Sequence, residues 1–189
     1  MGGMKPSILL QPLGDVDKNL LYDTCRRLQR IIDVNVDVSD IYIEIPEEAF
    51  DNLRGQYLST TILHHLKIWS VKLPYDKIVG ISNVDAYTNG LNFVFGEAEL
   101  GGRVAVVYLA RLRPEFYGGE PNYELFVTRC LKEILHELGH TFGLLHCRNR
   151  RCVMTFSNSI YDTDYKEANY CRNCSAYLLR NGVRVLNPL

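Results

Sequence analysis

One segment constrains this chain more than any other: His136-Glu-Leu-Gly-His140-Thr-Phe-Gly143-Leu-Leu-His146. On a helix, residues four apart lie one above the other, so His136 and His140 project from one face toward a single ion. Glu137 lies about 100° further around the helix axis. From there a carboxylate reaches metal-bound water instead of joining the ligand set. The segment therefore predicts a hydrolytic metal site on a helix.

His146 cannot share that face if the helix simply continues. Gly143 can take a positive φ at little cost, turn the chain and bring His146 back under the metal. Three neutral histidines leave a fourth position open for water, as in catalytic zinc sites. Zinc lowers the pKa of that water toward ~7, and Glu137 can take its proton and pass it to a leaving amine. Chance occurrence of H-E-x-x-H on an exposed helix is the alternative, and the third histidine, Gly143 and Met154 weaken it.

Four of the six cysteines form a second candidate metal site. The pairs Cys147-x4-Cys152 and Cys171-x2-Cys174 have the spacings of a closed four-cysteine zinc site. A disulfide pair, a redox switch and an iron site are the competing interpretations. Because Cys147 directly follows His146, we favour a structural zinc that ties the tail to the histidine turn.

Zinc with four thiolates carries a formal charge of about −2. The arginines inside the two ligand loops are the natural partners for that charge, so we expect them near the sulfurs. They are Arg148, Arg150, Arg151 and Arg172. The other two cysteines, Cys25 and Cys130, lie on apolar faces of predicted helices, where buried, inert thiols are expected.

The remaining pattern predicts a mixed sheet with helices packed on it. Expected helices cover residues 18–32, 56–70 and 122–142, the first capped by Asp15 or Asp17. Expected strands cover residues 7–13, 36–45, 77–84, 92–98 and 103–112. The last two strands must be antiparallel, because Gly101 and Gly102 are too short a connection for a parallel crossover. From Leu144 onward the chain is short, rich in cysteine and poor in regular pattern.

Chain length and net charge limit the possible domain organisation and classes of function. The 189 residues suffice for one compact domain, or for two lobes that share a cleft. A net charge of −1 gives no sign of nucleic-acid binding or of a membrane-seeking surface. No apolar stretch approaches the length of a membrane span, and the first residues lack a secretory profile. A cytoplasmic monomer is the default expectation, and we assign no function to Met1–Gly3.

The histidine segment resembles the metzincin zinc peptidases, and Met154 resembles the methionine of their Met-turn, which lies under the metal. With the four cysteines added, the chain is similar to the archaemetzincins, metzincin-like proteins that carry a second, four-cysteine zinc. The specific motifs cover residues 136–174.

The resemblance implies an α+β fold of two lobes around a cleft. Residues 1–143 would form an upper subdomain with a mixed twisted sheet and the active-site helix. Residues 144–189 would form a small subdomain with the Met-turn and the four-cysteine zinc. His136, His140 and His146 would hold a catalytic zinc, giving two zinc ions per chain, with Glu137 as general base. The edge strand, expected at residues 92–98, would receive peptide as an added strand.

This chain departs from the metzincin pattern at one position that affects catalytic power. Several metzincins place a tyrosine two residues after the Met-turn methionine, where it can stabilise an oxyanion. This chain has Thr155 and Phe156 there, and spacing does not choose among Tyr161, Tyr165 and Tyr170 as substitutes.

Three functions remain open. The leading hypothesis is a zinc-dependent peptidase that acts on peptides or small unfolded segments. The alternatives are a zinc-stabilised peptide-binding protein with little or no turnover, and a redox or zinc sensor that works through the cysteines. The sequence fixes neither the side-chain preference nor whether cleavage is internal or terminal.

Overall fold

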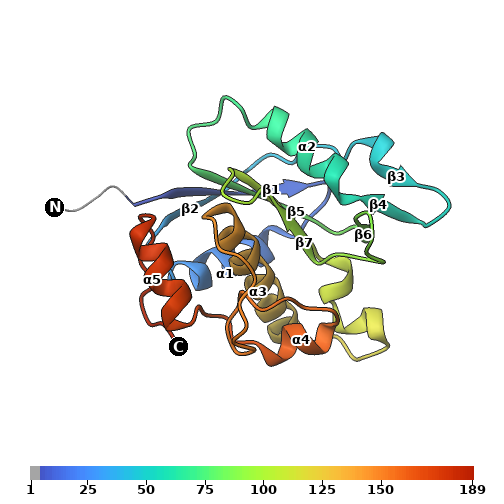
Figure 1. Ribbon diagram of the computed structural model, residues 1–189. Helices are drawn as coiled ribbons and strands as arrows, with labels where there is room; N and C mark the ends of the chain where they lie inside the picture. The colour runs from blue at the N-terminus through green and yellow to red at the C-terminus, as the bar shows by residue number, and fades with distance from the viewer. Residues whose placement is uncertain (1–4) are drawn as a thin grey trace.

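A twisted five-stranded sheet forms the centre of the computed structural model, which describes residues 5–189 and leaves Met1–Gly3 outside (Figure 1). The strand order is β2-β1-β5-β8-β7. Four strands are parallel, and β7 runs antiparallel to β8 at one edge, as predicted for this pair. The strands are β1 (Ser7–Leu13), β2 (Asn35–Val38), β5 (Lys77–Ser82), β7 (Gly96–Ala98) and β8 (Val104–Tyr108).

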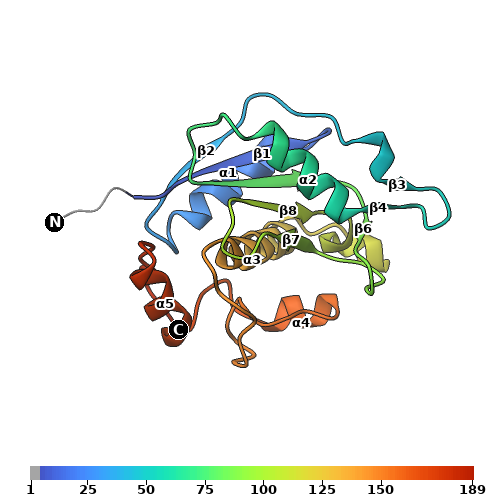
Figure 2. The same cartoon turned by 45° about the horizontal axis from the view of Figure 1, so that its top comes forward.

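Three long helices cover the two faces of this sheet (Figures 1 and 2). They are α1 (Lys18–Leu28), α2 (Ser59–Trp69) and α3 (Tyr123–Thr141). Alternate residues of β1 explain the layers: Ile8 and Leu10 join one apolar core with α1 and α3, whereas Leu9 joins the other core with α2. Burial on both faces is what a largely parallel sheet requires.

The predicted strand 36–45 is too long, because β2 ends at Val38. Beyond it Ile41 is exposed, and Ile43 makes only an isolated bridge to Leu13. The predicted helix 18–32 likewise ends at Leu28, and Asp17 is its N-cap, accepting from the Asn19 backbone N–H. Ile32 instead forms an isolated bridge with Val185 of the C-terminal segment, a long-range contact that local periodicity cannot reveal.

A second, smaller sheet was not predicted. It consists of β3 (Phe50–Asp51), β4 (Gln56–Leu58) and β6 (Ala86–Tyr87). Its strand β4 occupies the first residues of the predicted helix 56–70, so α2 begins only at Ser59. Short 3-10 turns complete the upper part of the chain, at Glu47–Ala49, Ala110–Leu112 and Pro114–Tyr117.

The other predicted strands are shortened at their ends. The segment 92–98 is regular only at Gly96–Ala98, with an isolated bridge from Val94 to Ala86. The segment 77–84 ends at Ser82, and the segment 103–112 leaves the sheet after Tyr108.

Helix α3 begins and ends where the sequence predicts, within one residue. Asn122 caps it by accepting a hydrogen bond from the Leu125 N–H at 3.0 Å. Gly143 stops it with φ of 95°, as expected for a left-handed C-terminal glycine. The N–H groups of Gly143 and Leu144 then donate to the last carbonyls of the helix, each at 2.9 Å. The chain therefore reverses directly after the second histidine.

The C-terminal segment contains two helices that the sequence pattern did not predict, α4 (Ile160–Tyr165) and α5 (Arg172–Arg180). Both lie below α3 in Figure 2. Val153, Met154 and Leu178 belong to the same apolar core as α1 and α3. No helix within residues 5–189 is long and apolar enough to cross a membrane.

Candidate active site

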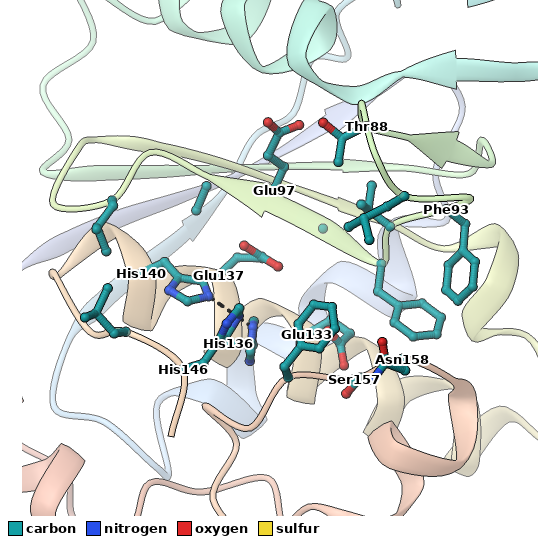
Figure 3. A pocket seen from close by; sticks show the side chains of 18 of the residues that line it. Thr88, Phe93, Glu97, Glu133, His136, Glu137, His140, His146, Ser157 and Asn158 are labelled. Atoms are coloured by element: carbon teal, nitrogen blue, oxygen red, sulfur yellow. Dashed lines mark hydrogen bonds between the residues drawn. The ribbon is translucent and has the colours of Figure 1, made fainter. Parts of the chain in front are cut away.

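A cleft of about 500 Å³ runs between the edge strand β7 and the helix α3. His136, Glu137 and His140 line it from α3, and His146 lines it from the chain that returns after Gly143. The segment 92–98 lines its opposite side, which is the position expected for this segment (Figure 3). The cleft therefore brings together an open strand edge and the histidine cluster.

Hydrogen bonds to backbone carbonyls orient two of the histidine rings. His136 Nδ1 lies 2.8 Å from the Val153 oxygen, and His140 Nδ1 lies 2.7 Å from the Leu144 oxygen. A carbonyl oxygen only accepts, so each Nδ1 carries the proton and each Nε2 keeps its lone pair.

The two Nε2 atoms are 3.1 Å apart. Two lone pairs facing each other at this distance repel, unless a cation lies between them. Two nitrogens on a tetrahedral zinc, at ~2.1 Å each, are about 3.4 Å apart. The donor set therefore fits a zinc ion.

His146 completes the cluster. The ligand atoms of the three histidines lie within 4.8 Å of one another. Its ring lies 5.3 Å from that of His136 and 4.8 Å from that of His140, centroid to centroid. Burial lowers the pKa of all three histidines, and most strongly that of His136, where the positive charge of Lys166 adds to the effect. The rings are therefore neutral near pH 7, the form that binds a metal.

Glu137 is buried beside the histidines under the edge strand. Burial raises the pKa of its carboxyl well above the ordinary value, and the nearby charge of Glu133 raises it further. Gly96 of β7 makes room for this side chain: a Cβ atom there would lie 2.6 Å from both Cγ and Oε1 of Glu137. A glycine inside a strand often marks such a close approach. Gly96 was therefore a sequence signal for this contact that the prediction did not use.

Met154 is fully buried against α3. A Cβ atom at Gly139, between the two helical histidines, would overlap the Met154 sulfur and lie 3.0 Å from its Cε. The methionine therefore packs directly on the face of α3 that carries the histidines.

The four cysteines meet at a second site, and none of them lines the cleft. Their sulfurs lie within 4.8 Å of one another. The distances are 3.8 Å from Cys147 to Cys171 and 3.7 Å from Cys152 to Cys174. A disulfide would need about 2.05 Å, whereas a tetrahedral zinc with bonds of ~2.3 Å separates its sulfurs by about 3.8 Å. The geometry fits a metal and not the competing disulfide pairs.

The arginines relate to these sulfurs only in part as expected. Arg148 and Arg172 line a hollow beside Cys147 and Cys171. Arg150 lies over the Tyr165 ring, and Arg151 pairs with Glu167. All four arginine side chains are exposed.

Backbone amides donate to the sulfurs instead. The N–H of Asn149 reaches the Cys147 sulfur at 3.4 Å, and that of Cys171 reaches the Cys152 sulfur at 3.3 Å.

None of the candidate tyrosines lines the cleft as the structure describes it. Tyr161 is exposed, and Tyr165 packs under Arg150. Tyr170 is buried and donates its hydroxyl to the Leu135 carbonyl at 2.5 Å. Phe156 takes the place next to the histidines, 5.0 Å from the His146 ring, and offers no hydroxyl.

A buried ion pair next to the histidines escaped the sequence-based prediction. Glu133 precedes His136 by one helical turn, and its Oε1 lies 3.0 Å from the Lys166 Nζ and 3.0 Å from the Thr163 hydroxyl. The spacing of Glu133 and His136 could have placed Glu133 on the same helix face. Lys166, from the C-terminal segment, has no such local signal.

The sheet has an antiparallel edge strand next to the helix that carries H-E-x-x-H, and a buried methionine packs under that helix. This combination defines a metzincin-like zinc peptidase. Residues 8–180 match the model of Peptidase family M54. The chain is 44% identical over 178 residues to the archaemetzincin of Methanocaldococcus jannaschii, which covers 94% of this chain and 96% of that protein. The chain therefore belongs to the archaemetzincins, the M54 family of zinc metallopeptidases.

Solved structures agree with this assignment. The crystal structure of archaemetzincin from Methanopyrus kandleri superposes with a TM-score of 0.83 at 38% identity, covering 94% of this chain and 95% of that one. A zinc-dependent peptidase from Methanocorpusculum labreanum gives 0.84 at 29% identity, covering 90% and 99%. The fold prediction of a mixed, metzincin-like α+β architecture is confirmed.

Proposed function

We propose that this chain hydrolyses peptide bonds at the histidine cluster, with His136, His140 and His146 as ligands of a catalytic zinc and Glu137 as general base. The observation that carries the proposal is the pair of inward-facing Nε2 lone pairs, held 3.1 Å apart beside a buried carboxylate. Zinc bound there supplies a Lewis acid and lowers the pKa of a bound water toward ~7.

Glu137 transfers the proton, and the edge strand positions the peptide. Glu137 lies under the edge strand, where burial raises its pKa and so increases its strength as a base. It takes a proton from water and gives it to the leaving amine. The free edge of β7 offers backbone N–H and C=O groups to an extended peptide, which would add to the sheet as a further strand.

We infer that the four cysteines hold a structural zinc, so that each chain carries two zinc ions. Their closed set of four sulfurs leaves no position for water. Cys147 follows His146 directly, and its N–H donates to the Met154 carbonyl at 2.9 Å. A metal at the cysteines would thereby stabilise the turn that carries both His146 and Met154. We also infer that the chain divides at Gly143 into an upper subdomain, residues 1–143, and a lower one, residues 144–189.

The decisive experiment is cleavage of a mixed peptide library by zinc-loaded protein, next to Glu137→Ala with matched zinc content. We expect cuts by the wild type that the variant does not make, and their positions distinguish terminal from internal cleavage. If both proteins cleave equally, Glu137 is not the base. If neither cleaves while two zinc ions are bound, the peptidase proposal fails.

Phe156 supports a second candidate function, a peptide-binding protein with little turnover. Its ring stands beside His146 and supplies no hydroxyl to an oxyanion. This function predicts peptide binding with the same affinity in the wild type and in Glu137→Ala. The buried Glu137 argues against it, because binding alone does not need that carboxylate.

A further inference from the structure

The cleft is asymmetric along the edge strand. At the Ala98 end it passes His140, whose carbonyl accepts from the Gly101 N–H at 2.8 Å. At the other end it passes Phe95 and Phe93 and reaches Glu133, one helical turn before His136 (Figure 3). Antiparallel pairing is the more stable arrangement for an added strand. A peptide paired in this way with β7 places the residues that follow the cleaved bond at the Phe93 end.

The walls of this end are aromatic. Phe93 and Phe95 contact each other edge to face, with ring centroids 5.1 Å apart. Phe156 lines the same cleft from the returning chain, next to His146. These three rings favour a large, flat side chain over a small or strongly hydrated one.

The floor of this end is polar. Glu133 is only 2% exposed, and its Oε1 is occupied by the Thr163 hydroxyl and by Lys166. Its Oε2 has no hydrogen-bond partner among residues 5–189, although Glu133 lines the cleft. The site therefore presents Glu133 Oε2 as a free acceptor at the base of an aromatic slot, and the Ser157 hydroxyl, also unpartnered in that range, belongs to the same lining.

The charge of the Glu133–Lys166 pair determines which substrate side chain can donate to Glu133 Oε2. Lys166 is fully buried and already neutralises Glu133 at 3.0 Å. A lysine or arginine from a substrate would add a second positive charge next to Lys166, at a carboxylate that already has its counter-charge, and its desolvation would be poorly offset there. A neutral O–H donor satisfies Oε2 and leaves the net charge unchanged.

We propose that this end of the cleft selects a tyrosine immediately after the cleaved bond, with its ring between the three phenylalanines and its hydroxyl donating to Glu133. The inference rests on the proposed peptidase function for the position of the bond. Glu133 acts here as a specificity residue through direct contact with the substrate side chain. Phenylalanine fills the same space but leaves Oε2 without a partner.

The test uses binding, so that it does not depend on turnover. Hydroxamates in which the chelating group is followed by a tyrosine, phenylalanine, leucine or lysine side chain are titrated into zinc-loaded protein. A hydrogen bond to a charged group predicts that the tyrosine compound binds about 10- to 100-fold more tightly than the phenylalanine compound. The peptide library is read in parallel for tyrosine at the same position.

Two variants separate the hydrogen bond from the fold. Glu133→Gln leaves Lys166 buried without its counter-charge, so the double variant Glu133→Gln/Lys166→Met is measured beside it, each with its zinc content and melting temperature. In the folded variants we expect the preference for tyrosine over phenylalanine to fall to about threefold or less. Glu124→Gln, the same change near the exposed start of α3, is the matched control and keeps the preference.

Equal binding of the tyrosine and phenylalanine compounds would overturn the proposal, and so would tighter binding of the lysine compound. A preference unchanged in the folded double variant would also overturn it. If the library is not cleaved but the tyrosine compound still binds preferentially, the proposed peptidase function fails and the subsite stands.

Discussion

At the residue scale, Gly96 and Gly139 leave space that neighbouring side chains of the site occupy. A Cβ at Gly96 meets Glu137, and a Cβ at Gly139 meets Met154. Neither glycine has a positive φ, so an alanine is compatible with the backbone at both positions. The two substitutions therefore test contacts and not strain.

Gly96→Ala should move the Glu137 carboxyl while leaving the histidines in place. A displacement of about 1 Å can cost about 100-fold in rate, so we expect kcat/KM to fall by about that factor. Zinc content should match that of the wild type. Unchanged peptide cleavage would mean that the contact with Gly96 does not position Glu137.

Gly139→Ala should destabilise the protein through Met154. Overpacking costs about 1–3 kcal/mol, offset by about 1 kcal/mol of helix propensity gained over glycine. The double variant Gly139→Ala/Met154→Ala removes the overlap, so urea unfolding should give a favourable coupling of about 1 kcal/mol or more. Additive effects of the two substitutions would argue against direct packing at this point.

At the scale of elements, α3 and α4 are joined by buried charges. Arg129 of α3 donates to both carboxylate oxygens of Asp164, at 2.7 and 2.6 Å. Lys132, one turn further, donates to the carbonyls of Thr163 and Asp164 at 2.9 and 3.0 Å, near the end of α4. Polar side chains of the active-site helix therefore hold the segment from which Lys166 approaches Glu133.

Asp164→Asn should weaken the contact between α3 and α4. The Arg129 side chain is only 7% exposed and would lose its charged partner. We expect a loss of about 2 kcal/mol in the free energy of unfolding, together with faster amide exchange in α4. Glu167→Gln, in the exposed pair with Arg151, should stay within about 0.5 kcal/mol of the wild type. Equal losses in both variants would contradict a specific role of the buried pair.

Helix α3 could be predicted within one residue, because its cap, its apolar period and its terminating glycine are all local in the sequence. Strand β2 and helix α1 were predicted too long, since apolar alternation continues into Ile41 and apolar periodicity continues into Ile32. Those residues pair elsewhere or face solvent. Helices α4 and α5 were missed because each is short, although Ser159 and Asp162 form a capping box at the start of α4.

At the scale of the whole molecule, the two metal sites should differ in how they release zinc. A three-histidine site keeps an open position, whereas four thiolates enclose the metal. We expect a mild chelator to remove one zinc per chain with little change in melting temperature. Removal of the second zinc should lower the melting temperature sharply and raise amide exchange across residues 144–189, because metal binding there contributes to folding.

Zinc per chain, measured by mass spectrometry alongside amide exchange, checks this order. Release of both metals in one step would contradict two independent sites. Full protection of residues 144–189 after loss of the second zinc would contradict its structural role.

Both candidate metal sites could be predicted from local relations in the sequence. Helical geometry fixes where His136, Glu137 and His140 point, and Gly143 permits the one turn that returns His146. Close cysteine spacings likewise indicate a metal before any fold is known. Each of these relations spans a few residues, so covalent geometry and hydrogen-bond periodicity suffice to predict it.

The surroundings of these two sites depend on how distant parts of the chain pack together. The edge strand places Gly96 over Glu137, and the packing of α4 against α3 places Lys166 beside Glu133. The tertiary structure also brings Cys147 and Cys171 together and turns Arg150 and Arg151 toward Tyr165 and Glu167. These contacts join residues far apart in the chain, and no local pattern encodes them, because they depend on how the sheet, the helices and the C-terminal segment pack.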